Sequence, residues 1–140
     1  MTRFPPATDE YYHVFNRGVD KRTVFEDNDE YRYFVHLLYV LNTNQQSHNT
    51  LRNFTAHIER GSTSINRGER VVDLVAFCLM PNHFHLLLRQ RVENGISKYM
   101  QKVGTGYTMY FNERHERSGA LFQGRYKYVH ITTVEIRGID

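Results

Sequence analysis

Two apolar runs joined by a two-residue turn constrain the fold of this chain more than any other feature. Val71 to Met80 and His83 to Gln90 are each of strand length, and Pro81-Asn82 between them is a strong turn signal. We therefore expect them to pair as an antiparallel hairpin. The longest run has ten residues and is interrupted by Asp73, which is too short for a bilayer, so we expect no membrane partner.

A strand and a helix are expected before this hairpin. Residues 11–16 (YYHVFN) are rich in aromatic and β-branched residues and lead into a turn at Arg17-Gly18. Asp27 and Glu30 fit a capping box, so we expect a helix to begin at Asp27. The apolar residues that repeat at helical spacing after it are Tyr31, Phe34, Val35, Leu38 and Leu41.

A second helix and a last strand are expected after the hairpin. Asn94 is a candidate N-cap and Gly119 a candidate stop for this helix. Its apolar stripe is formed by Ile96, Tyr99, Met100, Val103, Tyr107, Tyr110 and Phe111. Gly104 and Gly106 interrupt it, and because glycine costs about 1 kcal/mol in a helix interior, we expect another backbone to approach there. Residues 125–131 alternate well enough to form the final strand.

The resulting order β-α-β-β-α-β is that of the ferredoxin-like fold. We expect an α+β domain, with an antiparallel sheet and both helices on one face. A chain of 140 residues suffices for one domain, so we assign residues 1–140 to a single unit. Residues 42–70 are polar and without sustained period, which predicts a long surface loop.

The cellular setting follows from the single cysteine and the N-terminus. Cys78 alone cannot form an internal disulfide or a multi-cysteine metal site, and in an apolar strand we expect it to be buried. The first ten residues are polar and contain two prolines, unlike a secretory signal. These features predict a cytoplasmic protein of a reducing compartment.

Positive charge gathers in the second half of the chain. Between Arg89 and Lys127 basic residues outnumber acidic ones and alternate with tyrosine and phenylalanine. Basic groups neutralise phosphates and aromatic rings stack on unpaired bases, so this composition suits single-stranded nucleic acid. A solvated helix face over an aromatic core would have the same composition, and composition alone favours that reading.

His83-Phe84-His85 is the sharpest local signal. Because side chains alternate across a strand, both histidines project from one face and Phe84 from the other. Two imidazoles at this separation can bind one divalent ion, although an isolated His-x-His is more often structural. His13, His115 and His130 are further histidines near the proposed sheet or its helices, but their spacing does not tie any of them to this face.

Residues 80–88 (MPNHFHLLL) resemble the metal-binding signature of single-tyrosine transposases of the HUH nuclease superfamily, particularly the REP-associated tyrosine transposases. Residues 12–18 (YHVFNRG) resemble the first strand of that family. Residues 119–127 (GALFQGRYK) resemble the stretch that follows its second helix. Three such motifs in the family's order make a chance resemblance improbable.

The resemblance implies a DNA transposase that cleaves and rejoins single-stranded or hairpin DNA. His83 and His85 match the two histidine ligands, and Mg²⁺ or Mn²⁺ is the ion implied. In such enzymes the ion polarises the scissile phosphate while a tyrosine attacks it and forms a 5′-phosphotyrosine link. We expect Arg125 and Lys127 to contact phosphates, with Arg17 as a weaker third. The family includes homodimers and monomers, so a homodimer is one possible assembly.

The chain departs from the family at its C-terminus. The family tyrosine lies on a helix after the fourth strand, in a segment resembling Tyr-Ile-x-x-Asn-Pro, and residues 132–140 contain neither this motif nor a tyrosine. The chain thus resembles a truncated member, and no catalytic residue is assigned. Tyr107 and Tyr110 lie on an apolar stripe, where we expect them to pack in the core.

Three functions remain open at this stage. The first is a transposase whose tyrosine helix is supplied by further residues or by another chain. The second is a catalytically inactive domain that binds single-stranded nucleic acid. The third, a metal hydrolase using water, would need an acidic residue beside His83 and His85 as well as the third metal ligand, and the motif supplies neither.

Overall fold

The expected hairpin forms one side of the sheet in the structure, a computed structural model that describes residues 4–45 and 68–132. Strands β2 (Val72–Met80) and β3 (His83–Gln90) pair antiparallel, with Met80 opposite His83 across the two-residue turn. A β-bulge between Leu74 and Ala76 shifts the register of β2. The hairpin prediction is confirmed.

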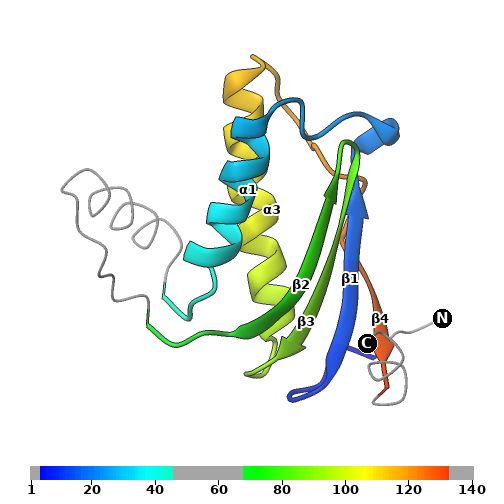
Figure 1. The fold of residues 1–140 in the computed structure, drawn as a ribbon, viewed down its shortest axis with the longest axis vertical. Coiled ribbons are helices and arrows are strands. Elements are labelled where there is room, and N and C mark those ends of the chain that lie inside the picture. The colour runs from blue at the N-terminus through cyan, green and yellow to red at the C-terminus, as the bar shows by residue number, and fades with distance from the viewer. Residues whose placement is uncertain (1–3, 46–67, 133–140) are drawn as a thin grey trace.

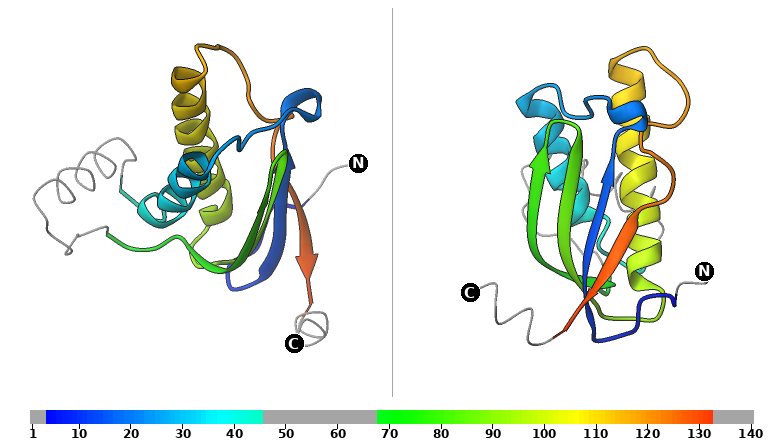
Figure 2. Two further views of the ribbon diagram at one scale, coloured as in Figure 1. Left: turned by 45° about the horizontal axis from the view of Figure 1, so that its top comes forward. Right: turned by 90° about the vertical axis from the view of Figure 1, so that its right-hand side faces the viewer.

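Four strands form one antiparallel sheet in the order β2-β3-β1-β4. Strand β1 (Tyr11–Arg17) lies between β3 and β4 (Lys127–Ile131). Helices α1 (Asn28–Val40) and α3 (Gly95–Arg114) pack against each other and cover one face of the sheet (Figure 1). The order β-α-β-β-α-β of the ferredoxin-like fold is confirmed, and no helix of the described residues covers the opposite face of the sheet, called here the open face (Figure 2).

Helix α1 begins as expected, but its buried face is turned slightly from the predicted stripe. The Asp27 carboxylate accepts a hydrogen bond from the Glu30 amide at 2.9 Å, whereas the Glu30 carboxylate bonds the Glu26 amide at 2.8 Å. Leu37 is fully buried, while Tyr31 and Val35 are half-buried. The two half-buried side chains lie nearer the border of the face that α3 and the sheet cover.

Helix α3 buries the expected apolar stripe, apart from the half-buried Tyr110. Asn94 occupies the N-cap position in a left-handed conformation, and its side chain makes no capping hydrogen bond. A Cβ atom at Gly106 would meet the Leu37 side chain of α1 at 3.5 Å, and one at Gly104 would meet nothing within 4 Å. The expected close backbone approach is therefore wrong among the described residues, since Gly106 meets only a side chain.

The start of the predicted polar loop belongs to the core, whereas its end, residues 68–70, is exposed as predicted. Asn42 is buried, and its amide bonds the backbone of Val71 and Val72 through three hydrogen bonds of 2.9 to 3.1 Å. Thr43 is buried as well. The rest of the loop, residues 46–67, lies outside the described residues.

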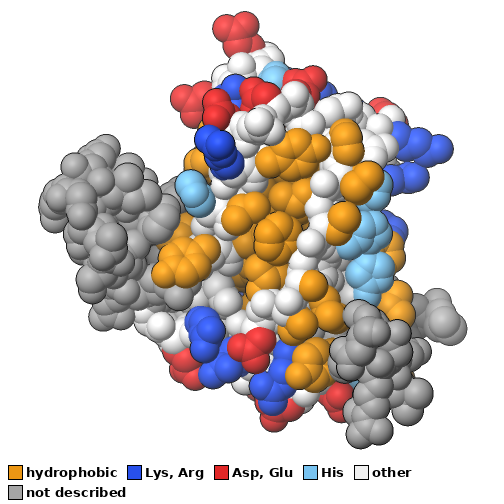
Figure 3. Space-filling model, viewed as in Figure 1, with side chains coloured by type: hydrophobic (Ala, Val, Ile, Leu, Met, Phe, Trp, Pro, Cys, Tyr) orange, Lys and Arg blue, Asp and Glu red, His pale blue; other side chains and the backbone are white. Residues whose placement is uncertain are grey.

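Strand β2 is an edge strand, and this explains its exposed apolar side chains. Val75, Phe77 and Met80 are each 41 to 52% exposed. Cys78 is also exposed, so its predicted burial is wrong: it pairs with His85 on the face without helices. In the space-filling view an apolar band runs between α1 and β2 (Figure 3).

No helix within residues 4–45 and 68–132 has the length and apolarity needed to cross a membrane.

Candidate metal and nucleic-acid site

The alternation of β3 places His83 and His85 on the open face of the sheet, as predicted. Phe84, Leu86 and Leu88 are buried under the helices, and His83 and His85 are half-buried. The two imidazole rings are 5.0 Å apart between centroids and nearly perpendicular. Histidine side chains gather on this part of the surface, beside β1 in Figure 3.

A third histidine reaches the pair from the neighbouring strand. Strand β1 pairs with β3 so that Phe15 lies opposite His85 and His13 opposite Leu87. His13 is thus the diagonal neighbour of His85, and its Nε2 atom lies 2.8 Å from Nδ1 of His85. Spacing along the chain could not reveal this contact, because the register between β1 and β3 is a tertiary property.

Each proposed ligand has its Nδ1 atom engaged. His83 donates its Nδ1–H to the side-chain oxygen of Asn82 at 2.7 Å, because an amide oxygen can only accept. His85 shares a hydrogen bond through Nδ1 with His13. Metal-binding histidines are usually oriented in this way through their second nitrogen. When His85 donates through Nδ1, both Nε2 atoms keep a lone pair for a metal ion.

The protonation state of the site also suits a metal ion. Burial lowers the pKa of His85, and the neighbouring His13 and His83 lower it further. Burial lowers the pKa of His13 as well. Neutral imidazole is the form that ligates metals, so the fit to a divalent ion is good.

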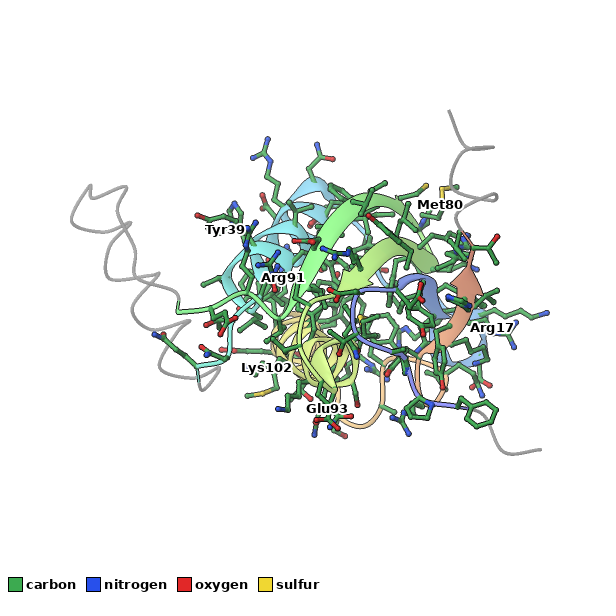
Figure 4. All side chains as sticks on the ribbon, turned by 90° about the horizontal axis from the view of Figure 1, so that it is seen from below. Arg17, Tyr39, Met80, Arg91, Glu93 and Lys102 are labelled. Carbon is green, nitrogen blue, oxygen red and sulfur yellow. The ribbon has the colours of Figure 1, made fainter. Side chains whose placement is uncertain are left out.

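Two cationic side chains border the same hollow. It has a volume of about 430 Å³ and is lined by Phe15, Asn16, Arg17, His83, Phe84, His85 and Lys127. Lys127 is opposite Phe15 on β4, and Arg17 is opposite His83. Figure 4 shows Arg17 on the side of the sheet away from the helices. The fold therefore brings four of the five predicted site residues to one hollow.

Arg125, the fifth predicted site residue, lies elsewhere. It lines a larger hollow on the helix side of the sheet, between α3 and the segment 119–126. Its guanidinium lies 5.6 Å from the centre of the Tyr126 ring, and one of its nitrogens is 3.5 Å from the Ser97 hydroxyl. Lys127, two residues later, starts β4 and points to the open face.

A separate cluster of potential metal ligands joins the start of α1 to the end of α3. Glu26, Glu30 and His115 each offer a ligand atom, and these atoms lie within 4.8 Å of one another. His115 contacts Glu30 at 2.6 Å and Glu26 at 3.1 Å, and Arg114 is 3.5 Å from the fully buried Glu30. These contacts account for the cluster as a tie between the start of α1 and the end of α3. The sequence analysis did not identify it, although the predicted capping position of Glu30 points to the helix start.

The three histidines of the open face do not form such a group within the described residues, and no carboxylate joins His83 and His85 there. A third histidine, cysteine or carboxylate ligand is therefore not provided by the described part of the chain. The described residues likewise place no acidic side chain beside His83 and His85, which a water-using metal hydrolase would need.

Comparison with known proteins assigns the chain to a family. A family model described as "Transposase IS200 like" matches residues 7–140. No curated protein matches the sequence. A REP-associated tyrosine transposase, solved bound to a REP hairpin, has a similar fold, with a TM-score of 0.57 and 10% identity over 99% of this chain and 68% of that one. A candidate transposase from Deinococcus radiodurans R1 aligns with a TM-score of 0.48 and 16% identity, over 99% of this chain and 92% of that one.

Proposed function

This chain belongs to the IS200-like transposase family, and we propose that it binds single-stranded or hairpin DNA on the open face of its sheet, with Mg²⁺ or Mn²⁺ at His83 and His85. The observation that carries the proposal is the pair of imidazoles whose Nδ1 atoms are engaged, in a hollow bordered by Arg17 and Lys127. The hairpin held by the relative of similar fold supports hairpin DNA as the partner.

Each residue of the hollow has a part in this proposal. A divalent ion bound there would polarise a scissile phosphate and hold it in place. Arg17 and Lys127 neutralise the neighbouring phosphates, and the ring of Phe15 offers a surface on which an unpaired base can stack. Imidazole alone favours later transition metals over Mg²⁺, so the choice of ion rests on the family and not on the donor atoms.

Cleavage and rejoining of the strand is the finer part of the proposal, and it requires a nucleophile. Tyr107 is fully buried and donates its hydroxyl hydrogen to the Val24 carbonyl. Tyr110 stacks on Tyr33 with a centroid separation of 3.8 Å. Both tyrosines are engaged in helix packing, as predicted, and we assign the phosphotyrosine link to neither of them.

A domain that binds single-stranded DNA without cleaving it is the second candidate, and the same hollow supports it. The two functions differ in one product, a covalent complex between protein and DNA. Denaturing electrophoresis with labelled hairpin DNA and Mn²⁺ distinguishes them. A homodimer also remains a proposal, for which the exposed apolar side chains of edge strand β2 offer a surface.

The test of the proposed site measures metal and DNA binding by the same variants. Calorimetric titration should give a heat of Mn²⁺ binding for the unmodified chain and none for the His83→Ala, His85→Ala double variant. His36→Ala, an exposed histidine of α1, is the matched control and should keep the unmodified heat. Fluorescence anisotropy should show tighter binding of single-stranded or hairpin DNA than of plain duplex. Equal heats from the double variant and the unmodified chain, or no DNA binding, would overturn the proposal.

A further inference from the structure

A second hollow, larger than that of the metal site, lies between α3 and the segment 119–126. Its volume is about 610 Å³, within the range of ligand pockets. Phe84, Leu121 and Phe122 form part of its apolar lining, and Ser97, Thr105 and Thr108 are among its polar lining residues. An apolar lining with a few polar groups suits a flat, partly polar ring.

Gly104 keeps one wall of this hollow open. A glycine in a helix interior is unfavourable relative to alanine, so its presence needs a reason. Gly106 has a packing reason, because Leu37 lies 3.5 Å from the position of its Cβ. Gly104 has no such neighbour in the described residues, and its missing side chain widens the hollow instead.

The hollow adjoins the proposed DNA site. Asn16 and Phe84 line both hollows, so one wall separates them. The Asn16 amide donates a hydrogen bond of 3.1 Å to the Gly124 carbonyl and thereby holds the segment 119–126 against the end of β1. A strand whose phosphate lies near His83 and Lys127 can thus reach both sides of this segment.

Arg125 supplies positive charge beside the second hollow. Its side chain is exposed, and its guanidinium lies near the ring of Tyr126, which also lines the hollow. Unpaired bases are recognised by stacking on aromatic rings and arginine planes, with phosphates neutralised nearby. Charge complementarity therefore favours a nucleotide over an apolar segment of protein.

We propose that the hollow beside Gly104 holds an unpaired nucleobase of the DNA strand bound at His83 and His85. The inference rests on the proposed function and adds a base-binding site to it. The base would lie against α3, with its backbone phosphate near Arg125.

The test combines a protein variant whose side chain fills the hollow with DNA probes that lack one base. The probes are a hairpin with a short single-stranded flank and a series of the same hairpin with one abasic site at each flank position. For the unmodified chain, one abasic site should weaken binding about tenfold, because stacking contributes about 1–3 kcal/mol per base. In Gly104→Leu, which fills the hollow, the intact hairpin should bind about tenfold more weakly, and that abasic site should cause no further loss.

Stability measurements separate this effect from misfolding. Because nothing lies within 4 Å of a Cβ at Gly104, Gly104→Ala should raise the thermal unfolding midpoint, and Gly104→Leu should not lower it. Gly106→Ala, on the helix face that meets α1, is the matched control and should bind every probe as the unmodified chain does.

Failure of the proposed base site can be distinguished from failure of the proposed DNA-binding function. If DNA binds but no abasic site matters, or if Gly104→Leu keeps the full abasic penalty, the base site is wrong and the proposed function stands. If Gly104→Leu weakens intact and abasic probes equally, the hollow has another occupant and the inference is again wrong. If the unmodified chain binds no DNA, both proposals fall.

Discussion

Nε2 of His13 on β1 lies 2.8 Å from Nδ1 of His85 on β3, and the two rings stack with centroids 5.0 Å apart. This contact crosses from one strand to the next on the open face of the sheet. It ties the tautomer of His85 to a residue that is 72 positions away in the chain. His13 thus orients a proposed metal ligand without being one itself.

Removing this contact should weaken metal binding while the fold is retained. We expect His13→Leu to lower the Mn²⁺ affinity about tenfold or more, the usual effect of losing such an orienting partner. His13→Gln keeps a carbonyl oxygen that can accept from His85 and should restore much of the affinity. Electron paramagnetic resonance of free Mn²⁺ measures both values, with His130→Leu on β4 as a control. Equal losses in the leucine and glutamine variants would contradict the orienting role.

The folded state should lose stability on acidification through the same histidines. Burial lowers the pKa values of His13 and His85 below the ordinary 6.5 of an unfolded chain. The unfolded state therefore binds more protons just below pH 6.5, so stability is complete above that pH and decreases as the pH falls through the folded pKa values. Urea unfolding midpoints between about pH 7.5 and 5 test this in the unmodified chain and in a His13→Gln, His85→Gln variant. An equal slope in both would count against the assignment to these two residues.

Arg17 and Lys127 should contribute to DNA affinity through phosphate contacts. Each alanine substitution should weaken binding of a single-stranded oligonucleotide and lower its salt slope by roughly one unit or slightly less. Arg91, which pairs with Asp73 at 3.0 Å and is labelled on another part of the molecule in Figure 4, is the matched control. Anisotropy titrations over a range of salt concentrations give the slopes. Affinity that does not change with salt would exclude phosphate contacts.

Asn42 should be among the most sensitive polar positions for stability. Asn42→Ala removes three buried hydrogen bonds and leaves the amides of Val71 and Val72 without that partner, so we expect a loss of about 2–4 kcal/mol in the free energy of unfolding. Asn44→Ala removes the hydrogen bond that the exposed Asn44 side chain accepts from the Glu69 amide and should cost less than about 1 kcal/mol. Denaturant unfolding followed by circular dichroism compares them, and similar losses for both variants would refute this account.

Tyr107 should matter for folding and not for DNA binding. Tyr107→Phe leaves the buried Val24 carbonyl without its donor, and we expect a loss of about 1–2 kcal/mol. Burial raises the pKa of this hydroxyl, which keeps it protonated and unreactive. Anisotropy should show unchanged DNA affinity. A covalent DNA adduct that forms with the unmodified chain but not with Tyr107→Phe would make Tyr107 a nucleophile.

Alternation and periodicity in the sequence determined the local structure around the site. Two strand-length apolar runs around Pro81-Asn82 specify the hairpin, and period two along residues 83–90 specifies that His83 and His85 share a face. These are properties of neighbouring residues, so they can be predicted from the sequence. The resemblance in residues 80–88 added the expected metal chemistry.

Tertiary structure alone decided which distant residues meet the two histidines. The register between β1 and β3 places His13 against His85, and the pairing of β1 with β4 brings Lys127 to the same hollow as Arg17. Burial of Asn42 likewise depends on the end of α1 meeting the start of β2. Each of these contacts joins segments far apart in the chain. Their register and packing are chosen by the free energy of the whole core, which no local pattern in the sequence records.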